Sequence, residues 1–180
     1  MIVLNELDIV RDVSKRLDDA GIGYMLTGSI AMNYYAEPRM TRDIDLVIAL
    51  RAEDAGRVVQ LFSRDYYVSR EAVDSSIKHQ SLFNLIHSES VIKVDCIVRK
   101  QTTFRLNEFE RRRRVKLRDF ETWIVSKEDL ILSKLYWAKD SHSEFQLRDV
   151  KSLVVTGCDR EYIARWTDEL GVASLWQEIA

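Results

Sequence analysis

Thr41-Arg42-Asp43-Ile44-Asp45-Leu46-Val47-Ile48 is the most informative segment of this 180-residue chain. Apolar residues alternate with polar ones, which predicts a strand over Asp43–Leu50 that buries one face. Ile44 and Leu46 point into the core. Asp43 and Asp45 point the other way, about 6.5–7 Å apart along the strand. Two carboxylates so close repel one another and favour a cation between them.

The ligands of such a site would be oxygen atoms only, which suits a hard cation such as Mg²⁺. A carboxylate pair can bridge two ions about 3.5–4 Å apart, a geometry that transfers phosphoryl or nucleotidyl groups. A second acidic strand, Ser90–Val98, has Lys93 and Asp95 on one face and apolar side chains on the other. An aspartate in an apolar strand needs a partner. We expect that partner to be the metal; the alternative is an arginine or a loop that Asp95 caps.

Upstream of the acidic pair, Leu26-Thr27-Gly28-Ser29 turns a short strand, Tyr24–Leu26, into a helix that ends near Tyr35. A glycine lets the backbone approach a ligand closely, and the free N–H groups of a helix start favour phosphate. Arg39 and Arg42 flank the carboxylates and could hold a triphosphate tail. The alternative is an ordinary helix start beside two surface arginines.

This combination resembles the nucleotidyltransferase superfamily that includes DNA polymerase beta, and within it the small bacterial proteins related to the AbiEii toxins. The match covers about residues 22–98: a Gly-Ser turn, an Asp-x-Asp strand and a third carboxylate on a later strand. The resemblance implies that Asp43, Asp45 and Asp95 bind Mg²⁺ or Mn²⁺ and are catalytic. It implies that Ser29 contacts the β- and γ-phosphates of the NTP. From their positions, we expect Gly28 and Arg42 to bind the nucleotide as well.

A helical lysine and a later aspartate extend the resemblance. AbiEii-like proteins have such a pair near the active site, and Lys134 and Asp149 match it, although segment 141–148 departs from the family in its arginines. The resemblance implies that Lys134 binds nucleotide and that Asp149, like Arg39, lies beside the site. From its spacing alone, Lys134 points either inward to phosphate or past the core to water. Trp137 and the other helical aromatic residues are interpreted as packing groups.

Composition limits the remaining classes of protein. The chain is 46% hydrophobic and 31% charged, which excludes disorder as its main state. Two cysteines cannot form a disulfide framework, and the three scattered histidines, His142 among them, argue against a zinc site. The first ten residues have no basic leader, and no run approaches a membrane span of about 20 apolar residues. We therefore expect a cytoplasmic protein without membrane contact.

Charge is unevenly distributed. The net charge is −2, but segment 99–118 has nine basic side chains against two acidic ones. They are Arg99, Lys100, Arg105, Arg111, Arg112, Arg113, Arg114, Lys116 and Arg118. This band is compatible with a polyphosphate or RNA partner, and equally with a solvated face of a strand or helix.

The pattern as a whole predicts an α/β (α+β) fold with a mixed sheet flanked by helices. Residues 1–125 would form a nucleotidyltransferase-like core and residues 126–180 a C-terminal helical region packed on it. The elements expected beyond those above are helices 6–19, 53–62, 126–139, 143–155, 159–170 and 173–179, and strands 81–87, 111–117 and 122–125.

The leading hypothesis is a metal-dependent nucleotidyltransferase that moves NMP from an NTP to a hydroxyl of RNA, a protein or a small molecule. The resemblance adds a toxin role, with tRNA as one acceptor and an antitoxin partner. A non-catalytic nucleotide- or partner-binding member of the same fold is the alternative. A Mg²⁺-dependent hydrolase is a third reading, disfavoured because no residue stands out to orient water.

Overall fold

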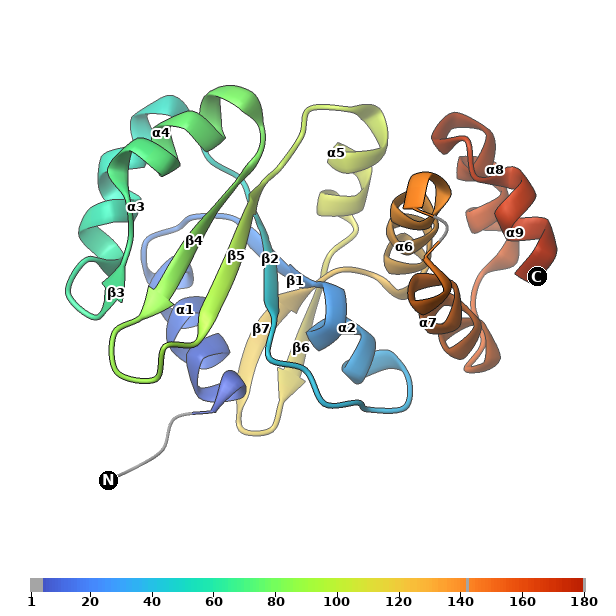
Figure 1. Cartoon of the computed structure of the whole chain (residues 1–180), viewed down its shortest axis with the longest axis horizontal. Coiled ribbons are helices and arrows are strands. Elements are labelled where there is room, and N and C mark those ends of the chain that lie inside the picture. The colour runs from blue at the N-terminus through green and yellow to red at the C-terminus, as the bar shows by residue number, and fades with distance from the viewer. Residues whose placement is uncertain (1–4, 142, 180) are drawn as a thin grey trace.

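The computed structural model describes residues 5–141 and 143–179, which form a mixed seven-stranded sheet with helices around it (Figure 1). Expectations that concern residues 1–4 or His142 lie outside this range. The strands are β1 (Tyr24–Thr27), β2 (Ile44–Ile48), β3 (Tyr66–Tyr67), β4 (Leu82–His87), β5 (Lys93–Val98), β6 (Arg113–Leu117) and β7 (Phe120–Ile124). Their order in the sheet is β3-β4-β5-β2-β1-β7-β6. The predicted mixed α/β sheet is therefore confirmed.

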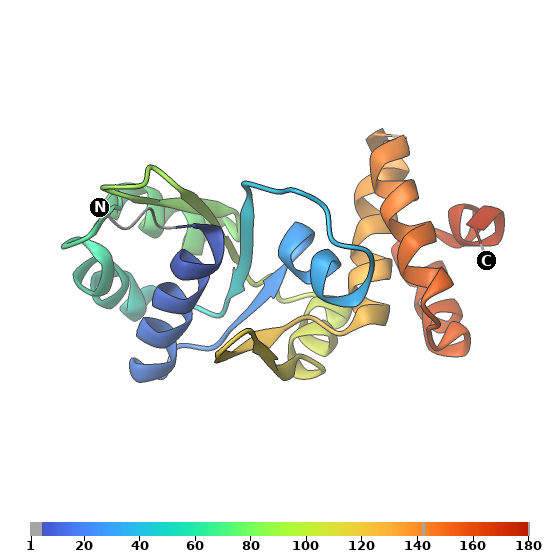
Figure 2. The same ribbon diagram turned by 90° about the horizontal axis from the view of Figure 1, so that it is seen from below.

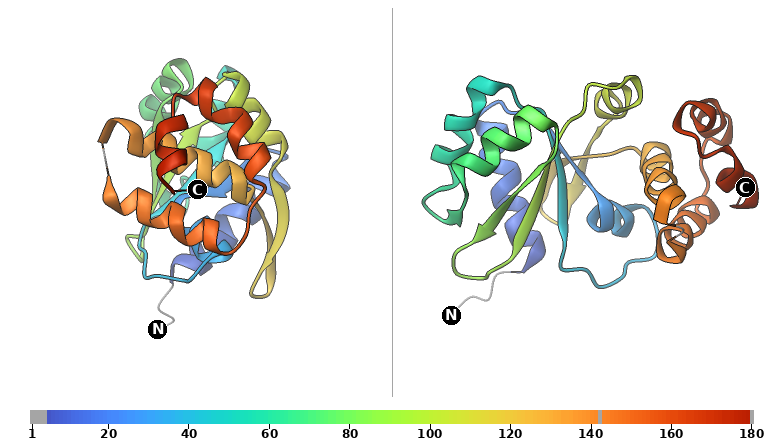
Figure 3. Two further views of the ribbon diagram at one scale, coloured as in Figure 1. Left: turned by 90° about the vertical axis from the view of Figure 1, so that its right-hand side faces the viewer. Right: turned by 45° about the horizontal axis from the view of Figure 1, so that its top comes forward.

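The helices are α1 (Glu6–Asp19), α2 (Gly28–Tyr35), α3 (Ala55–Phe62), α4 (Arg70–His79), α5 (Thr103–Glu110), α6 (Lys127–Ser141), α7 (Glu144–Val155), α8 (Arg160–Leu170) and α9 (Ala173–Ile179), with a 3₁₀ turn at Ala52–Asp54 before α3. The helices α6 to α9 contact one another and gather at one end of the molecule (Figure 2). Between them and the sheet lies α2, which contacts α6 and α7 (Figure 3). The division into two domains after residue 125 stays a prediction.

Strand directions bring distant segments together at the centre of the sheet. β2 pairs antiparallel with β1 and parallel with β5, and β1 pairs parallel with β7. β4 pairs antiparallel with β5. The two acidic strands are thus direct neighbours.

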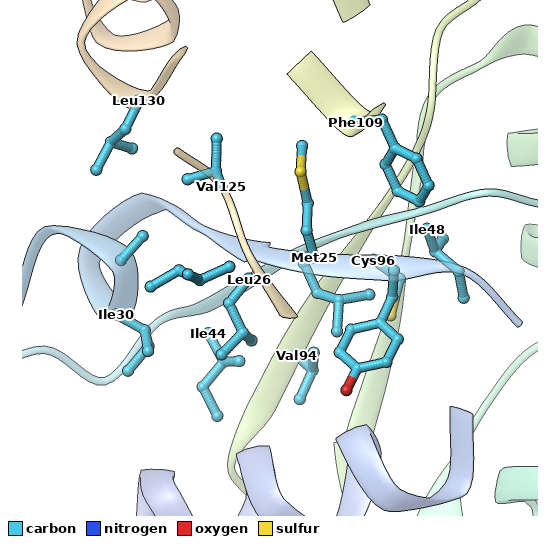
Figure 4. Packing of buried hydrophobic residues seen from close by; sticks show 14 of the residues in the cluster. Met25, Leu26, Ile30, Ile44, Ile48, Val94, Cys96, Phe109, Val125 and Leu130 are labelled. Carbon is cyan, nitrogen blue, oxygen red and sulfur yellow. The ribbon is translucent and has the colours of Figure 1, made fainter. Parts of the chain in front are cut away.

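The core confirms the alternation in these strands. Ile44 and Leu46 of β2 and Val94 and Cys96 of β5 are at most 1% exposed. Figure 4 shows Ile44, Val94 and Cys96 within one apolar cluster that also includes Leu26 of β1. Burial of one face of both strands leaves the opposite face for polar side chains.

Several elements differ from expectation. β2 begins at Ile44 and β5 at Lys93, so Asp43 precedes its strand. β3, α4 and α5 were not predicted, because their apolar patterns are weak. In α4 the buried side chains are Val73 and Ser76, and the Ser76 hydroxyl donates to carbonyls of Ala72 and Leu82. In α5 a buried glutamate, Glu108, interrupts the apolar stripe.

The β4–β5 turn offers a test of backbone strain. Val91 has φ +58° and is 74% exposed, and a β-branched residue in this left-handed region costs about 1–2 kcal/mol. Val91→Gly is expected to raise the free energy of unfolding by about 1 kcal/mol, measured by urea denaturation. Ser88→Gly in the same turn is the control, and equal stabilisation by both variants would contradict the strain.

Candidate active site

A row of polar side chains crosses four strands on the face opposite the core. Asp45 on β2 is the register partner of Thr27 on β1 and of Asp95 on β5. Asp95 in turn lies opposite Asn84 on β4. Because neighbouring strands are about 4.8 Å apart, the two aspartates lie side by side. Asp43, exposed just before β2, is on the same side of the strand.

The surroundings of Asp45 disfavour the charged form of its carboxyl group. Burial raises the pKa of its carboxyl, and the charges of Asp95 and Asp43 raise it further, while those of Lys134 and Lys93 oppose them. Among the side chains that the structure describes, none donates a hydrogen bond to the Asp45 carboxylate. A partly buried carboxylate without a donor favours a proton or a cation at this point.

Asp95 has protein partners. Lys93 Nζ lies 3.1 Å from Asp95 Oδ1, and Asn84 Nδ2 donates to the same oxygen. The hydrogen bond from Lys93 to Asp95 raises the pKa of the lysine. The partner of Asp95 is thus a lysine on its own strand, rather than the arginine that the alternative interpretation named.

Gly28 joins the acidic row to the start of α2. It has φ +58°, and a Cβ at this position would lie 2.2 Å from Asp45 Oδ2. Only glycine lets the start of α2 come this close to the carboxylate. The first residue of α2 therefore lies directly against the Asp45 carboxylate.

Gly28→Ala is expected to displace Asp45 and to lower the free energy of unfolding by about 1–2 kcal/mol, since alanine is strained at positive φ and clashes with the carboxylate. Thermal unfolding measures this loss. Gly157→Ala is the matched control: its φ is +83°, and a Cβ there would meet no atom within 4 Å. An equal loss in both variants would contradict the close approach to Asp45.

Beside the helix start, three elements contribute one cationic cluster. Lys134 Nζ on α6 donates to Asp149 Oδ2 on α7 at 2.7 Å. Arg39 Nη2 lies 3.1 Å from the same carboxylate oxygen and 3.1 Å from Ser29 Oγ. Lys134 and Asp149 are both buried, so the lysine points inward and not to water. Asp149 thus holds two cations next to Ser29.

A cavity of about 610 Å³ lies between the polar face of the sheet and α6. The predicted residues in its lining are Gly28, Ser29, Arg39, Asp45 and Lys134. Arg42, by contrast, is exposed and lies outside the lining. Asp43 and Asp95, the neighbours of Asp45, also lie outside it.

Several lining residues were not assigned to this site from the sequence. Glu108 and Ser133 carried no prediction, and Arg99, Lys100 and Arg105 were named only as part of the basic band. Trp137, interpreted as a packing group, also lines the cavity. Trp137 is 57% exposed, so its interpretation as a packing group is wrong. Burial raises the pKa of Glu108, although Arg105 and Ser133 bind its carboxylate. Glu108 lies between Phe104 and Phe109 in the sequence, and this position beside apolar residues could have indicated that its side chain is buried.

The acidic row fits a divalent cation in its chemistry. As the side chains stand, residues 5–141 and 143–179 contain no group of three His, Cys, Asp or Glu that could hold a metal. Asp45 and Asp95 nevertheless offer adjacent carboxylate oxygens as ligands. No side chain that the structure describes donates a hydrogen bond to Asp45. A cation between them would relieve the repulsion that, together with burial, raises the pKa of Asp45.

Among the helices of the described residues, none has both the length and the hydropathy that a membrane span requires.

Comparison with known proteins identifies the fold. No protein-family model matches the sequence, and no curated protein matches it. Among solved structures, an antigenic nucleotidyltransferase-like protein from Paracoccidioides brasiliensis is similar, with a TM-score of 0.65 and 19% identity over 96% of this chain and 88% of that one. The lincosamide adenylyltransferase LnuA, bound to lincomycin, gives 0.57 and 16% over 84% and 98%. ANT(2'')-Ia in complex with adenylyl-2''-tobramycin gives 0.56 and 13% over 96% and 97%. The chain has the nucleotidyltransferase fold.

Proposed function

We propose that this chain, which has the nucleotidyltransferase fold, transfers NMP from an NTP to an acceptor hydroxyl with the help of Mg²⁺ or Mn²⁺. The observation that supports this most is the contact of Gly28 with Asp45, beside the register pair Asp45 and Asp95. It brings a helix start suited to phosphate against carboxylates suited to a cation. Such an arrangement fits attack on an α-phosphate.

The roles follow from position. Asp43, Asp45 and Asp95 would hold the cation, which when bound neutralises the carboxylates and polarises the α-phosphate. Ser29, Arg39 and Lys134 would bind the β- and γ-phosphates and stabilise the charge of the leaving group. Arg42, exposed beside Asp43, would reach the nucleotide from the loop before β2.

The chemical step is a substitution at phosphorus. The acceptor oxygen forms a bond to the α-phosphorus, and the bond from that phosphorus to the bridging oxygen breaks, releasing pyrophosphate. Asp95 takes the proton of the acceptor hydroxyl and passes it to solvent. Lys93 Nζ, 3.1 Å from Asp95 Oδ1, fixes the position of that carboxylate.

The acceptor could be RNA, including tRNA, a protein or a small molecule. A cytoplasmic toxin that modifies tRNA and is restrained by an antitoxin is the most specific version of this proposal. It is tested by inducing the chain in bacteria without its genomic neighbours. Growth arrest that Asp45→Asn abolishes would support the toxin role, and unaffected growth would contradict it.

A non-catalytic nucleotide-binding protein of the same fold is the second candidate. One observation favours it: Lys93 and Asn84 already occupy Asp95 Oδ1. The repulsion between Asp45 and its neighbouring carboxylates argues against a non-catalytic protein. Adjacent carboxylates are unfavourable unless a cation binds between them.

The experiment that separates the candidates uses each α-³²P-labelled NTP with Mg²⁺ and total RNA, protein and small-molecule fractions. Label on an acceptor with release of pyrophosphate supports transfer. Free NMP would indicate a hydrolase, and calorimetric binding of NTP without turnover would indicate the non-catalytic protein. Asp74→Asn is the control variant and should react like the native protein, because Asp74 forms an exposed ion pair with Arg70 on α4.

A further inference from the structure

The polar face of β2 and β5 changes character along the strands. At one end lie Asp45 and Asp95. Next come Val47 and Ile97, which are register partners, and Ile97 also pairs with Leu82 on β4. All three apolar side chains of this band line the cavity, and Leu82 is 48% exposed. The face therefore has an acidic end followed by an accessible apolar band.

Two basic residues close the band at its other end. Arg99 and Lys100 follow β5 directly and line the same cavity. Arg99 comes four residues after Asp95, about 13 Å along an extended chain. Ligand groups bound at the two ends would therefore be separated by the length of a small molecule.

Arg99 lacks a neutralising partner within the part of the chain that the structure describes. It forms no ion pair there, and its Nε is buried without a hydrogen bond. Its guanidinium stacks 4.9 Å from the centre of the Phe109 ring, and that of Arg112 stacks 4.2 Å from the same centre. Burial lowers the pKa of Arg112. The charge of Glu110 raises that pKa, and the charge of Arg99 lowers it. Two cations that repel one another favour an anion nearby.

The cavity lining as a whole is basic. It contains five Lys and Arg side chains against three Asp and Glu. Two of the five, Arg39 and Lys134, belong to the proposed triphosphate site, and Arg105 is paired with Glu108. Arg99 and Lys100 remain for another ligand group. Trp137 on α6 also lines the cavity, and it is 57% exposed.

We infer that the acceptor is a small anionic molecule whose negative group binds Arg99 and Lys100 and whose body lies between the apolar band and Trp137. This inference rests on the proposed function, and it puts the acceptor hydroxyl at Asp95. A cavity of about 610 Å³ is the size of a small-molecule site. A polycationic acceptor such as an aminoglycoside would meet like charge at Arg99, which disfavours it.

The test uses phenyl phosphate as the anionic probe and benzylamine as its cationic counterpart. The protein is first saturated with Mg²⁺ and an ATP analogue with a methylene bridge between the α- and β-phosphates, which fills the triphosphate site without reacting. We expect calorimetry to detect binding of phenyl phosphate and not of benzylamine. Arg99→Gln/Lys100→Gln should raise the Kd of phenyl phosphate about tenfold or more, because it removes both charge-assisted contacts. Lys116→Gln, exposed on β6, is the control and should leave that Kd unchanged.

The outcomes separate the two proposals. If the analogue binds but phenyl phosphate does not, or binds the double variant as well as the native protein, the anionic acceptor is wrong and the proposed function stands. Binding of benzylamine in preference to phenyl phosphate would also overturn it, as would transfer of label to RNA that phenyl phosphate does not inhibit. Failure of the analogue to bind at all would contradict the proposed function itself. Unchanged thermal unfolding of the double variant verifies that it is folded.

Discussion

Asp45→Asn is expected to lower kcat for nucleotidyl transfer by about 10³-fold or more while leaving the fold intact. Asparagine keeps the size of the side chain but removes the negative charge that would hold a divalent cation against the α-phosphate, and one preorganised electrostatic group is worth about this factor. The measurement is single-turnover transfer from α-³²P-labelled NTP at saturating Mg²⁺. Full activity in Asp45→Asn would refute the site, whereas Asp74→Asn should react like the native protein.

The same substitution should stabilise the metal-free protein. Burial and the neighbouring carboxylates raise the pKa of Asp45 above its value in the unfolded chain. The folded state therefore binds the proton more tightly, and the stability from this group is complete below the unfolded pKa and is lost as the pH rises through the folded pKa. Asp45→Asn removes that loss, so its Tm without divalent cations should exceed the native Tm at pH 7, and the two should converge towards pH 4.

Calorimetry from pH 4 to 7 in the presence of a chelator measures this difference. Added Mg²⁺ should raise the native Tm, because a ligand that binds only the folded state stabilises it, and should leave the Tm of Asp45→Asn nearly unchanged. A variant that is less stable than the native protein at pH 7 would mean that Asp45 makes favourable contacts, contrary to the electrostatics of the site.

The central strands could be predicted from sequence because their burial is one-sided. Alternation marks Ile44 and Leu46 in β2 and Val94 and Cys96 in β5, and each of these side chains is at most 1% exposed. A period of two fixes which face is buried, so it also fixes that Asp45 and Asp95 leave the core. The pairing of β2 with β5 in a register that joins the two aspartates is a tertiary property, which no local pattern contains.

The sequence points to parts of the candidate site where the backbone or the charge pattern is unusual. It does not point to parts that depend on contacts between distant segments. Gly28 beside an acidic strand gave a clear signal. The basic residues at segment 99–118 gave an ambiguous one: the structure separates Arg99, which lines the cavity, from Arg111, which binds the buried Asp129, and Arg114, which binds Asp18. Only the folded structure shows which of these cations has no carboxylate partner within the described residues.

Asp149→Ala is expected to lower the free energy of unfolding by about 3–5 kcal/mol, the cost of removing one partner of a buried ion pair. Asp149 and Lys134 are 5% and 7% exposed, with 2.7 Å between carboxylate and ammonium. The variant would leave the Lys134 charge buried. It would also release Arg39, whose Nε is already buried without a hydrogen bond to any residue that the structure describes. Urea denaturation measures the loss. Transfer should fall as well, because both cations lose the group that fixes them beside Ser29.

A double variant distinguishes the effect of the buried charges from the effect of side-chain packing between α6 and α7. Lys134→Met/Asp149→Leu removes both charges and keeps apolar volume, so it should recover most of the stability lost in Asp149→Ala. It should not recover transfer, because no cation then replaces Lys134 at the triphosphate. Asp74→Ala, which breaks the exposed pair with Arg70, should cost at most about 1 kcal/mol. If the double variant were as unstable as Asp149→Ala, the loss would come from packing between α6 and α7; if it were fully active, Lys134 would have no part in binding the nucleotide.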